Sequence, residues 1–194
     1  MSALPEALFG DVPMLPIYLA LNRAMRRVGS LASSDPERVR LLAGWGPLVR
    51  RLISGMERCP RAIDSPCGDS SSGGMDLWRG MVGNFEEVAG RFVGGGYVVF
   101  TAFTSATPSL LKAYLIARAG CDEEEPVVWL MKMTGFHGRR ISMCSLFPME
   151  DEYVFVPHTK FMCCACYLQL VDAAGEMVNV VHLVEERTSA AVVS

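Results

Sequence analysis

Apolar residues near the start of the chain recur at three- and four-residue intervals, the spacing that places side chains on one face of an α-helix. This stripe consists of Met14, Ile17, Tyr18, Leu21, Met25 and Val28. Gly29 follows it, where a glycine commonly ends a helix. The pattern therefore predicts a first helix that stops near Gly29.

Two more helices are predicted before the chain changes character. Ser34 and Glu37 have the three-residue spacing of a capping box, which marks a helix start. Pro47 is placed to open a third helix, because proline is favoured in the first turn. Cys59 and Pro60 would end it. Residues 1–60 are therefore expected to be mainly helical.

A different pattern follows a loop at residues 61–75 that is rich in serine, glycine, aspartate and proline. Short runs of β-branched and aromatic residues then alternate with turn-forming residues. The predicted strands cover 75–80, 97–103, 126–133, 139–144, 152–157, 160–171 and 176–184. Helices followed by strands indicate an α+β fold with mixed or antiparallel sheets. For 194 residues we expect one domain, 1–194, with a helical part at 1–60 and a β-rich core at 75–185.

Composition and charge argue against several classes of function. A net charge of −3 gives no electrostatic footprint for nucleic acid, and Arg23, Arg26 and Arg27 are interpreted as a solvated helix face. No run reaches the ~18 apolar residues that a membrane span needs. The start of the chain lacks the basic region of a signal peptide. Seven cysteines, an odd number, favour free thiols. We expect a soluble, cytoplasmic protein.

Cys163, Cys164 and Cys166 lie in a predicted strand, where successive side chains point to opposite faces. Their thiolates would not converge on zinc, and the Cys-x-x-Cys spacing is absent. We therefore expect no metal and interpret these cysteines as core residues of a strand that is buried on both faces. His137 is expected in an exposed turn.

Two carboxylates are predicted to share a face at the start of one strand. In the segment SLFPMEDEYVFVP, residues 145–157, strand alternation would place Glu150 and Glu152 on one side and Asp151 on the other. Acidic residues at such a junction are usually solvated, and taken alone this pair would be read in that way.

Arg79 and Ser105 each follow a β-rich run, in LWRG at 77–80 and FTSAT at 103–107. A guanidinium is a planar fork that suits phosphate oxygens. A serine hydroxyl can donate to a carboxylate or a sugar hydroxyl and can also accept. Together with the acidic pair, these residues form a candidate site.

The order of these segments resembles the Arg-Ser-Glu class of mono-ADP-ribosyltransferases. The resemblance rests on YLALNRAMRR, DLWRGM, GYVVFTAFTSATPSLLKAYL, WLMKMTGFHGRRISMCSLFP and EDEYVFVPHTKFMC, taken together and in that order. It implies N-terminal helices beside a mixed or antiparallel two-sheet core with an NAD-binding cleft.

The resemblance also implies residue roles. Arg79 would contact the phosphates of NAD+, and the backbone of Gly80 would hold the nicotinamide amide, both at a strand end. Ser105 would line the nicotinamide pocket and orient Glu152, the catalytic glutamate. Phe103 would wall the pocket, as would Trp78, although a core role is equally compatible with both.

The acceptor implied by the resemblance is an arginine side chain of a protein. Glu150 would serve as the base for its guanidinium, and Phe147 would be the aromatic residue of the substrate loop. The family's Ser-Thr-Ser motif is here Ser-Ala-Thr, with Ala106 and Thr107 as departures. The alternatives are an NAD+ glycohydrolase and an inactive NAD-binding module of the same fold.

Overall fold

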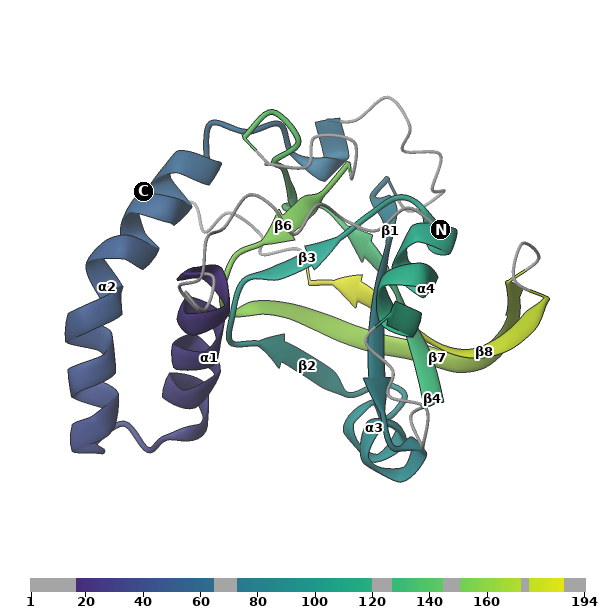
Figure 1. Ribbon diagram of the computed structural model, residues 1–194, viewed down its shortest axis with the longest axis horizontal. Coiled ribbons are helices and arrows are strands. Elements are labelled where there is room, and N and C mark those ends of the chain that lie inside the picture. The colour runs from purple at the N-terminus through teal and green to yellow at the C-terminus, as the bar shows by residue number, and fades with distance from the viewer. Residues whose placement is uncertain (1–16, 65–72, 120–126, 145–150, 172–174, 187–194) are drawn as a thin grey trace, which may run out of the picture.

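The computed structural model describes residues 17–64, 73–119, 127–144, 151–171 and 175–186 (Figure 1). In chain order its elements are α1 (Ile17–Ser30), α2 (Pro36–Met56), the 3₁₀ turn η2 (Ala62–Asp64), β1 (Met75–Gly83), α3 (Phe85–Arg91), β2 (Tyr97–Phe100), β3 (Thr104–Ala106), α4 (Leu110–Ala119), β4 (Val127–Gly135), β5 (Arg139–Arg140), β6 (Tyr153–Phe155), β7 (Thr159–Val171) and β8 (Glu176–Glu185).

Two sheets form the centre of the fold. The larger has five strands in the order β1-β4-β8-β7-β2, and the smaller has three in the order β3-β6-β5. The pairing of β4 with β8 is parallel, whereas the other pairings are antiparallel. The large sheet is therefore mixed, and the prediction of an α+β fold with mixed or antiparallel sheets is confirmed. The division of the chain at residues 60 and 75 stays a prediction.

The two sheets meet where β1 passes the end of β3. Trp78 N–H donates to the carbonyl of Thr107 at 2.6 Å, and Thr107 N–H donates back to the Trp78 carbonyl at 2.8 Å. These bonds fix the position of β3 relative to β1, because backbone hydrogen bonds hold neighbouring segments about 5 Å apart. The residues that follow Trp78 therefore lie near those that precede Thr107.

α1 and α2 pack against each other at one side of the sheets (Figure 1). The helix predicted up to Gly29 is confirmed as α1, but its buried face is narrower than the predicted stripe. Leu21, Met25 and Val28 are buried, whereas Ile17 and Tyr18 are largely exposed. Met14 lies outside the described residues.

The second and third predicted helices are one helix, α2, with Pro47 in its interior. Asp35, not Ser34, caps it, because the Asp35 side chain accepts a hydrogen bond from Glu37 N–H at 2.8 Å. An interior proline costs a helix about 3 kcal/mol or more. Val49 of α2 is buried against residues of α1. Because tertiary packing supplies most of the stability of helices in proteins, this contact allows α2 to continue past Pro47.

The sequence pattern also missed α3 and α4, which lie among the strands. α4 packs across β1 and β4 and buries Ala113, Tyr114 and Ala117 there. Several strand ends differ as well: β1 extends to Gly83, and β5 covers only Arg139–Arg140 of the predicted 139–144.

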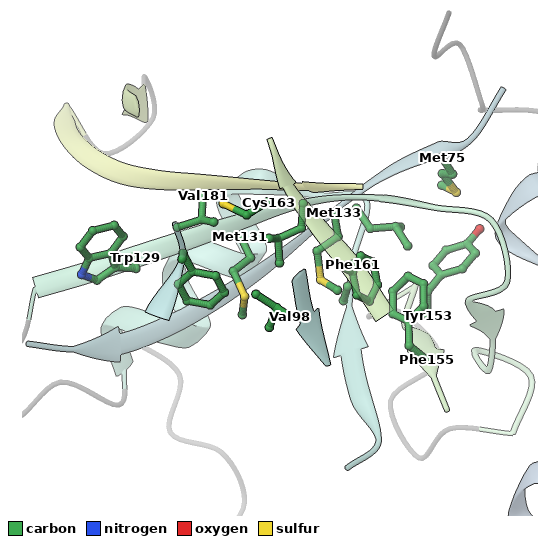
Figure 2. Packing of buried hydrophobic residues seen from close by; sticks show 14 of the residues in the cluster. Met75, Val98, Trp129, Met131, Met133, Tyr153, Phe155, Phe161, Cys163 and Val181 are labelled. Carbon is green, nitrogen blue, oxygen red and sulfur yellow. The ribbon is translucent and has the colours of Figure 1, made fainter. Parts of the chain in front are cut away.

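The main core lies on the face of the large sheet that is turned away from α4. Phe155 of β6 meets Phe161 of β7 edge to face with ring centroids 5.2 Å apart, and Phe100 meets Phe161 at 5.6 Å. Figure 2 shows Phe155 and Phe161 beside Met133, with Trp129 and Val181 further along the same cluster. Such offset aromatic contacts stabilise the core beyond the burial of their surface alone.

β7 is not buried on both faces as predicted. A β-bulge at Cys164 shifts the pairing with β8, so Cys163 and Cys166 fall on the same side of the strand. Cys163 is fully buried, but Cys164 and Cys166 are exposed. The strict alternation assumed from the sequence is therefore wrong here.

None of the described helices is both long and apolar enough to cross a membrane.

Candidate active site

Arg79 lies in the middle of β1, not at a strand end as predicted. Its neighbours at alternate positions, Leu77 and Met81, pack in or against the main core. The guanidinium Nη1 donates to the carbonyl of Ser105 at 2.8 Å and to its hydroxyl Oγ at 3.0 Å. The junction between the sheets thus brings together two residues that lie far apart in the sequence.

The charge of Arg79 is costly where it lies. Burial lowers the pKa of Arg79, and the like charge of Arg26 on α1 lowers it further. The carboxylate of Glu152 acts in the opposite direction and raises the pKa. The Arg79 charge is therefore acted on by both a cation and an anion, and its hydrogen bonds to Ser105 go to neutral oxygens. An anionic ligand would stabilise such a group.

Ser105 is the central residue of β3 and pairs with Val154 of β6. The two departures from the family motif have structural explanations. Ala106 is buried in the main core, where a hydroxyl would need a partner. The Thr107 hydroxyl accepts a hydrogen bond from Ser109 N–H at 3.3 Å, just before α4 begins.

Glu152 immediately precedes β6, and its carbonyl accepts a hydrogen bond from Ile141 N–H at 2.9 Å. Asp151 is not in a strand, since its φ of 47° lies in the left-handed region that a non-glycine residue rarely adopts. Two side chains hold it: Arg140 Nε donates to Oδ1 at 2.6 Å, and Ser142 Oγ donates to the same oxygen at 3.2 Å. The strand alternation assumed for residues 150–152 is therefore wrong at Asp151. Glu150 and Phe147 lie outside the described residues.

Gly80 faces α4, on the opposite side of β1 from Arg79. A Cβ at this position would collide with the carbonyl oxygen of Ala113 and would lie 2.6 Å from Cβ of Ala117. Only glycine allows α4 to come so close to β1. Gly80 thus has a packing role that the sequence did not indicate.

The two aromatic residues considered for the pocket lie in different places. Trp78 packs against the cluster between α4 and the sheet, on the face away from Arg79, which supports its core interpretation. Phe103 packs against the cluster that contains Leu21 and Met25 of α1. Phe103 is thus near the helix that also carries Arg26.

Two residues of α1 were missed as candidates. Arg26 is exposed, as predicted for a solvated helix face, but its charge also acts on Arg79, which the sequence did not indicate. The side-chain oxygen Oδ1 of Asn22, one helical turn earlier, is buried and has no hydrogen-bond partner among the described residues. A buried acceptor of this kind fits a donor supplied by a ligand. The four-residue spacing of Asn22 and Arg26 in LNRAMR was the available signal.

His137 lies exposed in the turn before β5, as predicted, and a buried carboxylate holds this turn. Glu185, which is 4% exposed, accepts hydrogen bonds from the backbone N–H groups of Phe136 at 2.5 Å and His137 at 2.9 Å. Its other oxygen lies 2.9 Å from His137 Nδ1. This buried carboxylate holds the turn that leads from β4 to β5. Within the described ranges, no three histidine, cysteine or acidic side chains are grouped so that they could hold a metal ion.

Comparison with solved structures identifies the architecture. The chain superposes on the ADP-ribosyltransferase Vis of Vibrio splendidus with a TM-score of 0.60 at 15% identity, over 91% of this chain and 71% of that one. For HopU1 of Pseudomonas syringae the TM-score is 0.56 at 18% identity, over 88% and 66% of the two chains. For Exoenzyme S of Pseudomonas aeruginosa it is 0.52 at 16% identity, over 88% and 68%.

No family model matches the sequence, and no curated protein sequence matches it. The structural matches nevertheless show that the chain has the ADP-ribosyltransferase fold. The α+β architecture expected from the resemblance, with helices beside a mixed sheet and a second antiparallel sheet, is thus confirmed.

Proposed function

We propose that this protein is a mono-ADP-ribosyltransferase that transfers ADP-ribose from NAD+ to an arginine side chain of a protein acceptor and releases nicotinamide. The observation that carries the proposal is the convergence of Arg79, Ser105 and Glu152 where the two sheets of an ADP-ribosyltransferase fold meet. The sequence patterns that suggested the three residues come from separate segments, and chance would not bring them together.

NAD+ as the substrate suits the charges of the site. Its diphosphate carries two negative charges, and Arg79 is a half-buried cation on whose charge a second cation, Arg26, acts. Binding of the diphosphate would remove the mutual repulsion of the two arginines. Asn22 would offer its buried Oδ1 to a donor group of the same ligand. Exoenzyme S, which shares the fold, was solved bound to carba-NAD.

Glu152 would assist the breaking of the bond between nicotinamide and ribose. Positive charge develops on the sugar as this bond breaks, so a carboxylate that hydrogen-bonds a ribose hydroxyl stabilises the transition state. Ser105, held by Arg79, would orient that carboxylate. Gly80 would present its backbone to the nicotinamide amide, and Phe103 would contribute to the wall of the pocket.

Arginine as the acceptor rests on Glu150 and on one of the structural matches. A guanidinium is a poor nucleophile until a base shares its proton, because its pKa lies above ~12. Glu150 would be that base, with Phe147 in the loop that meets the acceptor. Vis was solved in complex with agmatine, a small molecule with the guanidino group of arginine.

The test is nicotinamide release from NAD+ by the purified protein, with and without agmatine, with mass spectrometry of the acceptor. We expect release together with an ADP-ribosylated agmatine. Nicotinamide release without an adduct would instead identify an NAD+ glycohydrolase. NAD-dependent thermal stabilisation without release would identify an inactive binding module, an alternative supported by the altered Ser-Ala-Thr motif.

The substitution Glu150→Gln distinguishes an arginine-specific transferase from an NAD+ glycohydrolase. If Glu150 is the acceptor base, its substitution should abolish the agmatine adduct and leave part of the nicotinamide release. An equal loss of both products would contradict this role.

A further inference from the structure

Cys59 and Cys144 lie at the two ends of a contact between the helices and the small sheet. Cys59 follows α2, and its N–H donates to the Met56 carbonyl at 2.9 Å. Cys144 closes the turn after β5, where its N–H donates to the Ile141 carbonyl at 2.8 Å. Both are free cysteines; Cys59 is half-buried and Cys144 is exposed. None of the roles proposed above involves either of them.

Backbone pairing brings the two segments together. Ala62 N–H donates to the Gly138 carbonyl at 2.7 Å, and Arg140 N–H donates to the Pro60 carbonyl at 2.9 Å. The guanidinium of Arg139 adds a bond to the Cys59 carbonyl at 3.1 Å. The chain just after α2 therefore runs antiparallel to the chain around β5, and this arrangement carries Cys59 toward the turn that contains Cys144.

The two thiols lie close enough for one to affect the ionisation of the other. Burial raises the pKa of the Cys59 thiol, and the neighbouring Cys144 raises it further. A shallow pocket of about 330 Å³ lies between the two segments and is lined by Pro60, Arg140, Ser142 and Met143. Pro60 directly follows Cys59 in the chain, and Met143 directly precedes Cys144.

The turn that carries Cys144 is also bonded to the residues next to the candidate active site. Ile141, whose carbonyl binds Cys144 N–H, donates its own N–H to the Glu152 carbonyl at 2.9 Å. Ser142 Oγ donates to Asp151 at 3.2 Å. Any covalent restraint on Cys144 would thus act on the backbone of Glu152 through one intervening residue.

We propose that Cys59 and Cys144 form a reversible disulfide that links the end of α2 to the turn beside Glu152, with a small disulfide such as glutathione disulfide as the oxidant. A disulfide requires the two Cα atoms to lie within about 7 Å of each other, and the backbone bond from Arg140 to Pro60 places the two segments side by side. The exposed sulfur of Cys144, as the thiolate, attacks one sulfur of glutathione disulfide and releases one glutathione. Cys59 then loses its proton, attacks the Cys144 sulfur and releases the second glutathione. Two protein thiols are oxidised, and one disulfide is reduced to two thiols.

The disulfide would hold the turn in the arrangement that bonds Glu152. Its effect on turnover rests on the proposed function, but its formation does not. We expect the oxidised protein to release nicotinamide roughly twofold faster or more than the reduced protein, because positioning of a catalytic group contributes directly to rate. Equal rates in the two states would overturn the link to Glu152.

The experiment equilibrates the full chain in glutathione buffers from fully reduced to fully oxidised, blocks the remaining thiols by alkylation and maps the peptides by mass spectrometry. We expect a linked peptide pair containing Cys59 and Cys144 to appear before other cysteine pairs and to disappear with dithiothreitol. Oxidation should raise the Tm by roughly 5–10 °C, as expected for closing a long loop in a chain of this size.

Two variants provide the controls. Cys144→Ser should lose the shift in Tm, whereas Cys164→Ser, which removes another exposed thiol on β7, should keep it. Alkylation of Cys59 and Cys144 in every buffer, or linkage of either one to a different cysteine, would overturn the proposal. Because mapping and Tm need no substrate, they decide this inference even if the protein releases no nicotinamide.

Discussion

The two faces of β1 carry opposite charges in contrasting surroundings. Asp76 points to the face that α4 partly covers, where Lys132 Nζ lies 2.9 Å from one carboxylate oxygen and Thr134 Oγ1 donates to the other at 2.8 Å. Burial alone would raise the pKa of Asp76, but these two hydrogen bonds outweigh it and the pKa lies below its ordinary value. Arg79, on the other face, has a lowered pKa because burial disfavours its charge.

The contrast separates stabilising charges from functional ones. The Asp76 charge has a cation of its own, so the folded state favours it. The Arg79 charge is bonded to neutral oxygens of Ser105 and is repelled by Arg26, so the folded state bears a cost that an anionic ligand would relieve. Two positions on one strand thus have different roles, and five substitutions test the difference.

The largest effect is expected for Glu152→Gln. The amide keeps the size of the side chain but removes the charge that would stabilise the sugar cation, so nicotinamide release should fall roughly 100-fold or more. The matched control is Glu176→Gln, which alters a carboxylate that binds the Tyr114 hydroxyl at 2.6 Å, far along β8, and should leave release unchanged. Substantial residual release by the Glu152 variant would contradict its catalytic role.

Arg79→Met and Asp76→Asn compare the roles of the two faces of β1 in NAD+ binding and in stability. Loss of the guanidinium should weaken NAD+ binding about tenfold or more, which corresponds to about 1.4 kcal/mol, without lowering the Tm, since a partly desolvated charge is removed. Asp76→Asn should do the reverse: unchanged NAD+ affinity and a Tm lower by about 2–4 °C. Calorimetric titration with NAD+ and thermal unfolding measure both. A lower Tm for the arginine variant would show that Arg79 stabilises the fold.

Gly80→Ala should destabilise the fold through its contact with α4. The added methyl group would collide with the Ala113 carbonyl, and overpacking of this kind costs about 1–3 kcal/mol. Gly44→Ala in α2 is the control, because a Cβ there meets nothing within 4 Å and alanine favours a helix. Urea unfolding should give a lower midpoint for the first variant and an equal or higher one for the second.

The smallest effect concerns His182, whose Nε2 lies 3.2 Å from the Thr134 hydroxyl on the Asp76 face. Burial and Lys132 lower its pKa from the ordinary 6.5, so the unfolded chain binds the proton more readily. Stability should therefore fall as the pH drops below about 6.5, until the folded-state pKa is reached. His182→Gln should reduce this loss between pH 7.5 and 5.5, by less than about 1 kcal/mol. An unchanged slope of urea midpoint against pH would rule out this contribution.

The contribution of Asp76 occupies a separate pH range. Its lowered pKa stabilises the fold at pH values above the ordinary 3.8, and this stability is lost as the pH falls through the folded-state pKa. The two groups can therefore be distinguished by pH.

Much of the candidate site could be predicted because its residues lie in recognisable segments. Arg79, Ser105 and Glu152 were each selected from short motifs, and the structure brings the three together, although their roles stay predictions. Arg26 was missed because helical periodicity shows which side of the helix a residue occupies, but not which residues of other elements lie near that side. Gly80 was assigned a ligand role, whereas the close approach of α4 depends on an element that the sequence pattern did not reveal.

The errors in the predicted secondary structure also arise from tertiary contacts that local patterns do not show. Pro47 and the Ser34 capping pattern are correct local signals for a helix start, but burial of Val49 against α1 and capping by Asp35 outweigh them. The alternation of side chains failed at Cys164 because of a bulge and at Asp151 because Arg140 and Ser142 hold a left-handed backbone.

By itself, the sequence determined the class of the fold, the position of most strands and the chemical types of the site residues, because periodicity and polar residues at strand positions are local properties. Only the tertiary structure decided which side chains meet. The bonds between Trp78 and Thr107 align β1 with β3, and this alignment, made between segments far apart in the chain, places Ser105 on the guanidinium of Arg79. The pairing that brings the segment of Cys59 beside that of Cys144 is likewise made between distant parts of the chain, and no local pattern records it.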